Sequence, residues 1–248
     1  MSLDIYKTAI VTGASRGIGA ALVRRLRAKG LTVHAVARSA DALDALKRET
    51  GCVPHALDVA DRAAVVKTFA GMPVDVLVNN AGILAPAGAI FDHDAASVDK
   101  LFQINVAGVI NFLAAAAPGM KARRRGHIVN VSSMAGLMIS PGIPVYAASK
   151  AALHSLSQTL RIDLHGSNVR VSEIAPGRVK SGMHLQMMDD PKAAQERYYD
   201  GLRCLEPEDV ADAIMFVLAA PERMDVTLME INPTDQSYGG VNYHRAQG

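Results

Sequence analysis

The chain has 248 residues, half of them hydrophobic, and its 26 Lys and Arg nearly balance its 24 Asp and Glu. This length suits one large α/β domain, and the small net charge gives no reason to expect nucleic acid or an anionic membrane as a partner. Its two cysteines form no CxxC pattern, and no secretory signal precedes the first predicted strand, so we expect reduced thiols and a cytoplasmic protein.

Short β-branched runs alternate with longer helical patterns along the chain. In chain order we predict a strand at 8–11, a helix at 18–28, a strand at 32–36, a helix at 41–49, a strand at 53–57, a helix at 61–69, a strand at 74–78, a helix at 97–116 ending near Pro118–Gly119, a strand at 127–131, a helix at 146–164, a strand at 170–174, a helix at 207–218 and a strand at 226–231. This alternation predicts a doubly wound parallel sheet of the Rossmann type, in a single domain spanning 1–248.

Three other segments qualify this pattern. The apolar stretch 104–117 is too short to span a bilayer and indicates a buried helix. Residues 181–205, rich in Met, Tyr and charge, predict a flap that covers the substrate. The basic run Lys121–Arg125 indicates a solvated helix end, with a binding patch as the alternative. The eight histidines are scattered without HxxxH spacing, so no metal site is expected.

A glycine-rich turn directly follows the first predicted strand. The segment Thr12-Gly13-Ala14-Ser15-Arg16-Gly17-Ile18-Gly19 leads straight into a helix. Glycines at 13, 17 and 19 let the backbone approach a pyrophosphate, which the helix N-terminus stabilises. We therefore predict that Gly13, Ser15, Arg16, Gly17, Ile18 and Gly19 bind a dinucleotide cofactor.

The end of the second strand indicates which cofactor. A carboxylate there would bind the ribose 2′-hydroxyl of NAD, whereas an arginine suits the 2′-phosphate of NADP. The sequence has Arg38 at that place, with Arg16 as a second cation in the glycine turn. Although either could be an ordinary surface charge, guanidinium groups bind phosphate with planar, bidentate geometry, so we expect NADP(H) rather than NAD(H).

Tyr146 and Lys150 stand four residues apart at the start of a helix, where their side chains share one face. We expect the ammonium, helped by the positive charge of an oxidised nicotinamide, to lower the phenol pKa towards neutrality, so that Tyr146 exchanges a proton with a carbonyl or alcohol oxygen. A YxxxK pattern alone is weak. Ser133 strengthens it, because it follows a strand 13 residues earlier and can donate to the same oxygen. A local turn cap is the alternative for Ser133 and the preferred interpretation of Ser132.

Together, TGASRGIG, Asn79-Asn80-Ala81-Gly82, the serine and YxxxK resemble the short-chain dehydrogenase/reductase family over nearly the whole chain. The resemblance implies a seven-stranded parallel sheet, with Ser133, Tyr146 and Lys150 as the catalytic group. It also implies that Asn105 holds a water linking Lys150 to solvent, although an interhelix hydrogen bond would also satisfy that amide.

Further cofactor contacts follow from the resemblance. It places Asp58 and Val59 at the adenine, and Asn79, Ala81 and Gly82 along the ribose. Pro176, Gly177, Val179 and Ser181 resemble a PGxVxT turn beside the nicotinamide, with Ser181 where Thr is usual. A helix cap is the alternative for Asp58, and a plain turn for Pro176-Gly177.

Substrate specificity is expected from residues 83–85, 136–143 and the flap at 183–199. Met183, Met187 and Met188 could adapt to varied shapes or merely cover the sheet, and His184, Arg178 and Lys180 leave room for a substrate carboxylate. The tail 231–238 resembles broad carbonyl reductases and dehydrogenases of 3-hydroxy acids such as serine. Small residues along two helices, with the family resemblance, imply a homotetramer, or else a homodimer.

The predicted function is therefore NADP(H)-dependent hydride transfer between the nicotinamide and a small ketone, aldehyde or 3-hydroxy acid. A redox sensor without turnover is the alternative, but it would not need Ser133, Tyr146 and Lys150 together. Epimerase or dehydratase chemistry on an activated sugar is a third hypothesis. It usually requires a larger C-terminal domain than about 70 residues after Pro176 can form.

Overall fold

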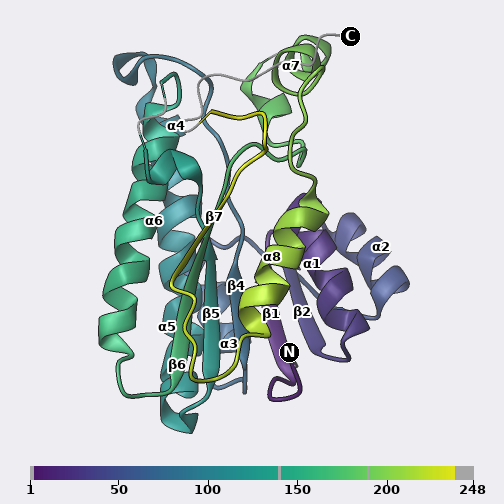
Figure 1. Cartoon of the computed structure of the whole chain (residues 1–248), viewed down its shortest axis with the longest axis vertical. Helices are drawn as coiled ribbons and strands as arrows, with labels where there is room; N and C mark the ends of the chain where they lie inside the picture. Colours follow the sequence, from purple (N-terminus) through teal and green to yellow (C-terminus); the bar gives the residue numbers. More distant parts are fainter. Residues whose placement is uncertain (1–2, 139–140, 189, 238–248) are drawn as a thin grey trace.

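The computed structural model describes residues 3–138, 141–188 and 190–237. It contains a seven-stranded, fully parallel sheet in the order β3-β2-β1-β4-β5-β6-β7 (Figure 1). The strands are β1 (Thr8–Thr12), β2 (Thr32–Ala37), β3 (Val53–Ala56), β4 (Val76–Asn79), β5 (Gly126–Val131), β6 (Val169–Pro176) and β7 (Leu228–Ile231). The main helices are α1 (Gly17–Ala28), α2 (Ala40–Thr50), α3 (Arg62–Phe69), α4 (Ala95–Phe102), α5 (Gly108–Arg123), α6 (Pro144–Asp163), α7 (Pro191–Tyr198) and α8 (Pro207–Leu218).

Helices cover both faces of the sheet, as the doubly wound prediction requires. In Figure 1, α1, α2 and α8 lie on one side of the strands and α5 and α6 on the other. Alternate residues of the strands enter two separate hydrophobic cores: Val11 and Val78 pack in the first with α1 and α8, and Ile10 and Leu77 in the second with α3 and α5. The strands are apolar on both faces because both faces are covered.

The long predicted helix is longer than expected and not uniform. It continues from α4 through a π-helical segment at Gln103–Ala107 into α5, and it passes Pro118. The prediction that it ends near Pro118–Gly119 is therefore wrong. Proline removes only the hydrogen bond to the carbonyl of Ala114, which is exposed to water, and the next turn buries Met120 completely. The helix ends instead at Arg124, in a left-handed conformation.

By length and composition alone, the continuous helix Ala95–Arg123 could cross a membrane. Its apolar window is 61% buried inside the fold, however, and Phe112 and Met120 lie in the second core. The apolar stretch around Asn105 is thus a core helix, as expected.

The basic run after this helix does more than face solvent. Arg125 binds the buried carboxylate of Asp75 at 2.8 Å, and Arg123 donates to the carbonyl of Val74 at 2.6 Å. Asp75 also accepts the backbone N–H of Lys7 at 2.7 Å. The five residues of the run are exposed, as predicted for a solvated helix end, and Arg123 and Arg125 also bind the end of α5 to the amino end of the sheet.

Five histidines, at positions 34, 55, 127, 154 and 184, have packing or hydrogen-bonding roles. His127 is fully buried between Tyr6 and Ser172, and burial lowers its pKa to about 3. His34 and His55 bind each other at 2.9 Å beside Phe69. No group of three His, Cys, Asp or Glu among the described residues is arranged to hold a metal ion. His244 lies outside the described residues.

Candidate active site

Two hollows meet at the carboxyl edge of the sheet. The larger, of about 580 Å³, is lined by Ser133, Tyr146 and Lys150 together with the turn at 176–181. The smaller, of about 190 Å³, is lined by the glycine turn and the ends of β2 and β3. Ile18, Asn80, Ser181 and Met183 line both hollows, which therefore form one continuous site. The structure thus brings the predicted catalytic and cofactor residues together.

The first two turns of α6 carry the tyrosine–lysine pair. The helix starts with Pro144, whose fixed φ and missing N–H suit a first helical position. Lys150 Nζ lies 5.7 Å from the centre of the Tyr146 ring and donates to the carbonyl of Val131 at 2.9 Å. This bond fixes the ammonium to the end of β5, directly before Ser132 and Ser133.

The pKa of Tyr146 reflects burial as well as nearby groups. Burial raises it to about 12, while a hydrogen bond with Ser133 lowers it. Burial likewise lowers the pKa of Lys150 to about 8, and the charge of Glu173 raises it. Loss of hydration thus outweighs the attraction of the neighbouring cation. The protein's own groups leave Tyr146 a phenol at pH 7, and the shift towards neutrality, which also relied on an oxidised nicotinamide, stays a prediction.

The structure gives the two serines after β5 different partners. Ser133 Oγ accepts the N–H of Ala135 at 3.1 Å, so it is a local cap, yet its own O–H can still donate into the larger hollow that it lines. Ser132 does not cap the backbone: its Oγ donates to the buried carboxylate of Glu173 at 2.5 Å. The preferred interpretation of Ser132 is therefore corrected.

Asn105 lies fully buried in the π-helical segment between α4 and α5. Its Oδ1 accepts the N–H of Ile83 at 2.9 Å, and its Nδ2 donates to the Ile83 carbonyl at 3.0 Å and to Ser149 Oγ at 3.1 Å. A Cβ placed on Gly82 would lie 3.4 Å from Asn105 Oδ1 and 3.6 Å from Lys150 Nζ. The side chains of Asn105 and Lys150 therefore both approach the backbone of Gly82. The interhelix bond expected as the alternative is present, and the water-holding role stays a prediction.

Gly136 permits the close approach of the loop after β5 to α6. A Cβ there would lie 2.6 Å from the carbonyl carbon of Lys150 and 2.7 Å from its oxygen. We expect Gly136→Ala to force α6 away from the loop carrying Ser133, lowering both kcat and the free energy of unfolding, the latter by roughly 2 kcal/mol. Denaturant unfolding and steady-state kinetics measure the two effects.

Gly119→Ala is the matched control for this substitution. Its Cβ would meet only the far end of the flexible Arg123 side chain, and alanine favours a helix interior. Equal stability of the Gly136 variant and wild type would contradict the steric argument.

The smaller hollow fits a dinucleotide phosphate. Gly13 and Gly17 have φ of +67° and +55°, which disfavours other residues, and a Cβ on Gly19 would lie 2.8 Å from Asn80 Nδ2. The first turn of α1 holds no acidic residue, and Arg16 at its N-cap makes no side-chain cap. Its N–H groups can thus donate to a pyrophosphate, and Ser15 and Ile18 line the same hollow.

The charged groups of this hollow suit a phosphorylated ribose. Arg38 follows β2 directly, is exposed, and lines the hollow together with Arg16. Asp58 and Val59 line it after β3. Asp58 accepts the N–H of Ala60 at 2.9 Å, whereas Asp61 caps α3, so Asp58 is not the helix cap. NADP(H), when bound here, supplies the hydride or accepts it.

The segment after β4 differs from the prediction at one position. Ala81 and Gly82 line the smaller hollow, but Asn79 lies outside both hollows and donates to Asn130 at 2.8 Å. Asn80 takes the place expected of Asn79: it lines both hollows and donates to the carbonyl of Thr12 at 2.9 Å. The alternation of strand faces places successive residues on opposite sides, which explains the shift by one residue.

The turn after β6 lies where it was expected. Pro176, Gly177, Val179 and Ser181 all line the larger hollow. Sequence reasoning missed Gln236, which also lines it and whose Oε1 accepts the N–H of Arg178 at 2.8 Å. Tyr238, the last residue of the tail resemblance, lies outside the described residues.

The flap contains a short 3₁₀ turn at His184–Met187 and the helix α7, above the end of the sheet in Figure 1. Met183, His184 and Met187 line the larger hollow, and so do Arg197 and Tyr198, which sequence reasoning missed. Met188 instead packs beside Tyr198 and Tyr199, and Lys180 pairs with Glu206 at 3.2 Å. Hydrogen bonds between 178–180 and Leu205 close the base of the flap. Asp189 lies outside the described residues.

The other two segments expected to set specificity contribute unequally. Leu84 lines the larger hollow, whereas Ile83 lines the smaller one and Ala85 neither. From 136–143, Met138, Pro141, Gly142 and Ile143 line the larger hollow. Ile139 and Ser140 lie outside the described residues.

A parallel sheet with a glycine turn, a paired tyrosine and lysine, and a hollow over its carboxyl edge defines a dinucleotide-dependent oxidoreductase. Residues 7–192 match the family model for short chain dehydrogenase, and the chain belongs to this family. It is 38% identical over 253 residues to the NADP-dependent 3-hydroxy acid dehydrogenase YdfG of Salmonella typhi, covering 96% of this chain and 99% of that protein.

Two further comparisons agree in family and fold. The enzyme of the same name from Escherichia coli is 36% identical over 246 residues, covering 95% of this chain and 98% of that one. A solved structure, the closed form of serine dehydrogenase complexed with NADP+, superposes with a TM-score of 0.90 at 34% identity, covering 96% of this chain and 100% of that chain.

Proposed function

We propose that this NADP(H)-dependent oxidoreductase interconverts small 3-hydroxy acids and the corresponding 3-oxo acids. The reaction class follows from the family and from NADP-dependent relatives. The substrate class is supported by the relatives named above, and by the charge of the hollow that holds Tyr146.

Tyr146 is the group that exchanges the proton. With its pKa raised to about 12, it is a phenol at neutral pH and can give its proton to a carbonyl oxygen during reduction. Ser133 donates to the same oxygen and holds it beside the phenol. Lys150, tied to the Val131 carbonyl, places its charge next to the Tyr146 ring and favours the phenolate that remains.

One observation carries the proposal of an acidic substrate. Among the described residues that line the larger hollow there is no Asp or Glu, and its permanent charges are Lys150, Arg178 and Arg197. His184 also lines it, with its pKa lowered to about 4 by burial and by Arg178. A site with cations and no facing carboxylate favours an anion.

Arg178 and Arg197 lie at the flap end of the hollow, and both lie close to one aromatic ring. Their guanidinium carbons lie 5.4 Å and 5.7 Å from the centre of the Tyr198 ring. Arg178 also donates to the Tyr198 carbonyl at 3.4 Å. The ring restrains both planar groups, and a guanidinium so restrained binds a carboxylate with little further loss of conformational freedom.

We expect Arg178→Leu to raise KM for 3-hydroxybutanoate by about 10- to 30-fold, because one charged hydrogen bond contributes roughly 1.5 to 2 kcal/mol. The methyl ester of the same acid lacks the charge, and its KM should stay within about twofold of wild type. Initial rates of NADP+ reduction measure both.

Arg203→Leu is the matched control, since Arg203 pairs with Asp235 at 2.6 Å and does not line the hollow. Equal losses for acid and ester in the Arg178 variant would exclude carboxylate recognition by this residue.

We also propose a cytoplasmic homotetramer, or else a homodimer, formed through α5 and α6. Supporting this, Ile110 on α5 is 41% exposed and Ile162 on α6 is 75% exposed, although both helices have buried faces. Exposed large apolar side chains of this kind are common at subunit interfaces. The redox sensor finds no support in these comparisons, whose relatives are dehydrogenases.

A further inference from the structure

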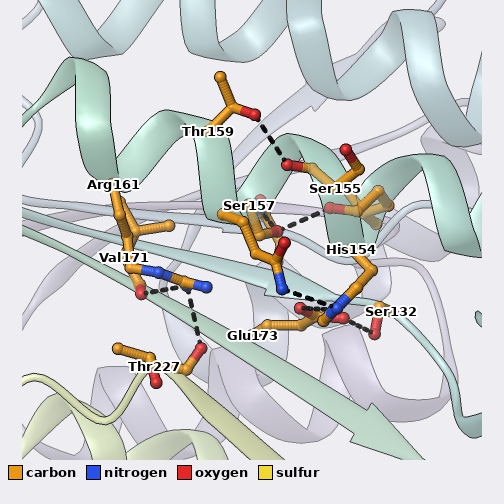
Figure 2. Close-up of polar contacts among 12 residues, drawn as sticks. Ser132, His154, Ser155, Ser157, Thr159, Arg161, Val171, Glu173 and Thr227 are labelled. Carbon is orange, nitrogen blue, oxygen red and sulfur yellow. Dashed lines mark hydrogen bonds and ion pairs between the residues drawn. The ribbon is translucent and has the colours of Figure 1, made fainter. Parts of the chain in front are cut away.

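A buried carboxylate lies on the strand beside the one whose end binds Lys150. Glu173, in the middle of β6, is fully buried, and a buried carboxylate is costly unless nearby groups compensate its charge. Ser132 Oγ donates to its Oε1 at 2.5 Å, and His154 Nδ1 lies 2.8 Å from its Oε2 (Figure 2). Each carboxylate oxygen therefore has a partner that fixes its direction.

Both partners belong to the elements that carry the catalytic residues. Ser132 directly precedes Ser133, and His154 stands one helical turn after Lys150 on α6. The peptide of Val131 and Ser132 joins these contacts, because the Val131 carbonyl accepts Lys150 while the Ser132 hydroxyl binds Glu173. The carboxylate thus lies on the face of β6 that packs against α6, the helix that carries Lys150.

We propose that Glu173 is the counter-ion of Lys150 and that Ser132 and His154 are the donors that position it. The carboxylate keeps the lysine protonated in a site that otherwise disfavours its charge. Glu173 contacts neither substrate nor cofactor in this scheme, so it is a positioning residue. The inference rests on Lys150 acting with Tyr146, and not on which acid is the substrate.

Among the described residues around Glu173, no permanently charged side chain other than Lys150 faces its carboxylate. On β5 its register partner is Asn130, and on β7 it is Leu228. On α6, Arg161 turns away to the carbonyls of Val171 and Thr227, as Figure 2 shows.

Arg170 and His127 approach β6 from its other face. Arg170 binds Tyr6 and the end of α8, and His127 binds Ser172. Lys150 and His154 are therefore the titratable groups that face Glu173 among the described residues. The Coulombic effect of Glu173 on Lys150, which raises the pKa of the lysine, agrees with this arrangement.

The direct test measures the protonation of Lys150 itself. Only the neutral amine reacts with acetic anhydride, so the extent of labelling of the Lys150 peptide against pH, read by mass spectrometry, reports its titration without any substrate. Glu173→Gln keeps the shape and one acceptor oxygen, replaces the other oxygen by an N–H donor, and removes the charge. We expect its labelling curve to move to lower pH by about one unit, and Glu173→Asp to keep the curve near that of wild type.

The kinetic test uses reduction of the neutral ester methyl 3-oxobutanoate by NADPH. The alkaline limb of kcat should move to lower pH in Glu173→Gln, by the same amount as the labelling curve, with KM for the ester little changed. Thr159→Ala, an exposed substitution on the same helix, is the control. If Glu173→Gln does not fold, Ser132→Ala is used in its place. It removes one donor to Glu173 and should move the labelling curve in the same direction by a smaller amount.

An unchanged labelling curve in Glu173→Gln, or in Ser132→Ala where the former is unfolded, overturns the proposal. A shifted labelling curve with an unchanged kcat profile supports the counter-ion role and refutes instead the assignment of Lys150 to the proton transfer.

Discussion

Replacing Tyr146 by phenylalanine should lower kcat by roughly 10³-fold while KM for NADPH changes little, because general acid–base catalysis contributes about 10² to 10⁴. The substitution removes one buried oxygen from the hollow and leaves the ring against Lys150. Single-turnover and steady-state measurements of NADPH oxidation with methyl 3-oxobutanoate test this expectation. Undiminished turnover would exclude Tyr146 as the proton donor.

The direction of the reaction should depend on pH through the same residue. Because the pKa of Tyr146 is raised to about 12, its proton is present at neutral pH and is lost only in strongly alkaline solution. Carbonyl reduction by wild type should therefore fall, and alcohol oxidation should rise, as pH increases. In Tyr146→Phe the ratio of the two rates keeps the pH dependence set by the proton that reduction consumes, but the titration of the tyrosine should disappear from both profiles.

Tyr6→Phe is the control for loss of a buried hydroxyl. Tyr6 accepts a hydrogen bond from Arg170 at 2.7 Å on the far side of the sheet and lines neither hollow. Its removal should lower the unfolding temperature without lowering kcat. A comparable loss of kcat in this variant would show that the effect at Tyr146 is structural.

The sequence predicts the parts of this site that depend on local pattern. The glycine turn, the YxxxK spacing and Ser133 lie at chain positions whose element type follows from periodicity, and the parallel sheet brings their ends to one edge. Arg38 is predictable for the same reason, since it follows a strand directly.

Other parts depend on contacts between distant segments. Arg197, Tyr198 and Gln236 line the hollow only because the flap and the chain after β7 fold over it. The pairing of Glu173 with Ser132 requires the register of β5 against β6, which no local pattern specifies. Pro118 within α5 shows the same limit: burial of Met120 overrides a strong local signal.

The effect of burial on the pKa of Tyr146 is likewise not visible in the local sequence pattern. The spacing of Tyr146 and Lys150 correctly predicts an adjacent cation, and this alone would lower the phenol pKa. Burial acts in the opposite direction on both groups, raising the pKa of the phenol and lowering that of the ammonium. The extent of burial depends on the loop after β5 and the flap, and helical periodicity does not report it.

The second large predicted effect is a loss of affinity for NADPH. Arg38→Ala should weaken NADPH binding by about 30- to 150-fold, because a guanidinium bound to phosphate contributes roughly 2 to 3 kcal/mol. NADH lacks the 2′-phosphate, so its Kd should change by less than about threefold. Fluorescence titration of the purified protein with each nucleotide measures both constants.

The control for Arg38→Ala removes the same positive charge from a position away from the cofactor site. Arg48→Ala removes an exposed arginine of α2 that does not line the smaller hollow. It should leave both Kd values near wild type, because exposed charges separated by more than about 10 Å are largely screened at moderate salt.

Arg16 lines the same hollow, so the double variant Arg16→Ala/Arg38→Ala should discriminate against NADPH more strongly than either single one. Equal losses for NADPH and NADH in Arg38→Ala would mean that this guanidinium does not recognise the 2′-phosphate, and selection for NADP(H) would then lie elsewhere in the hollow.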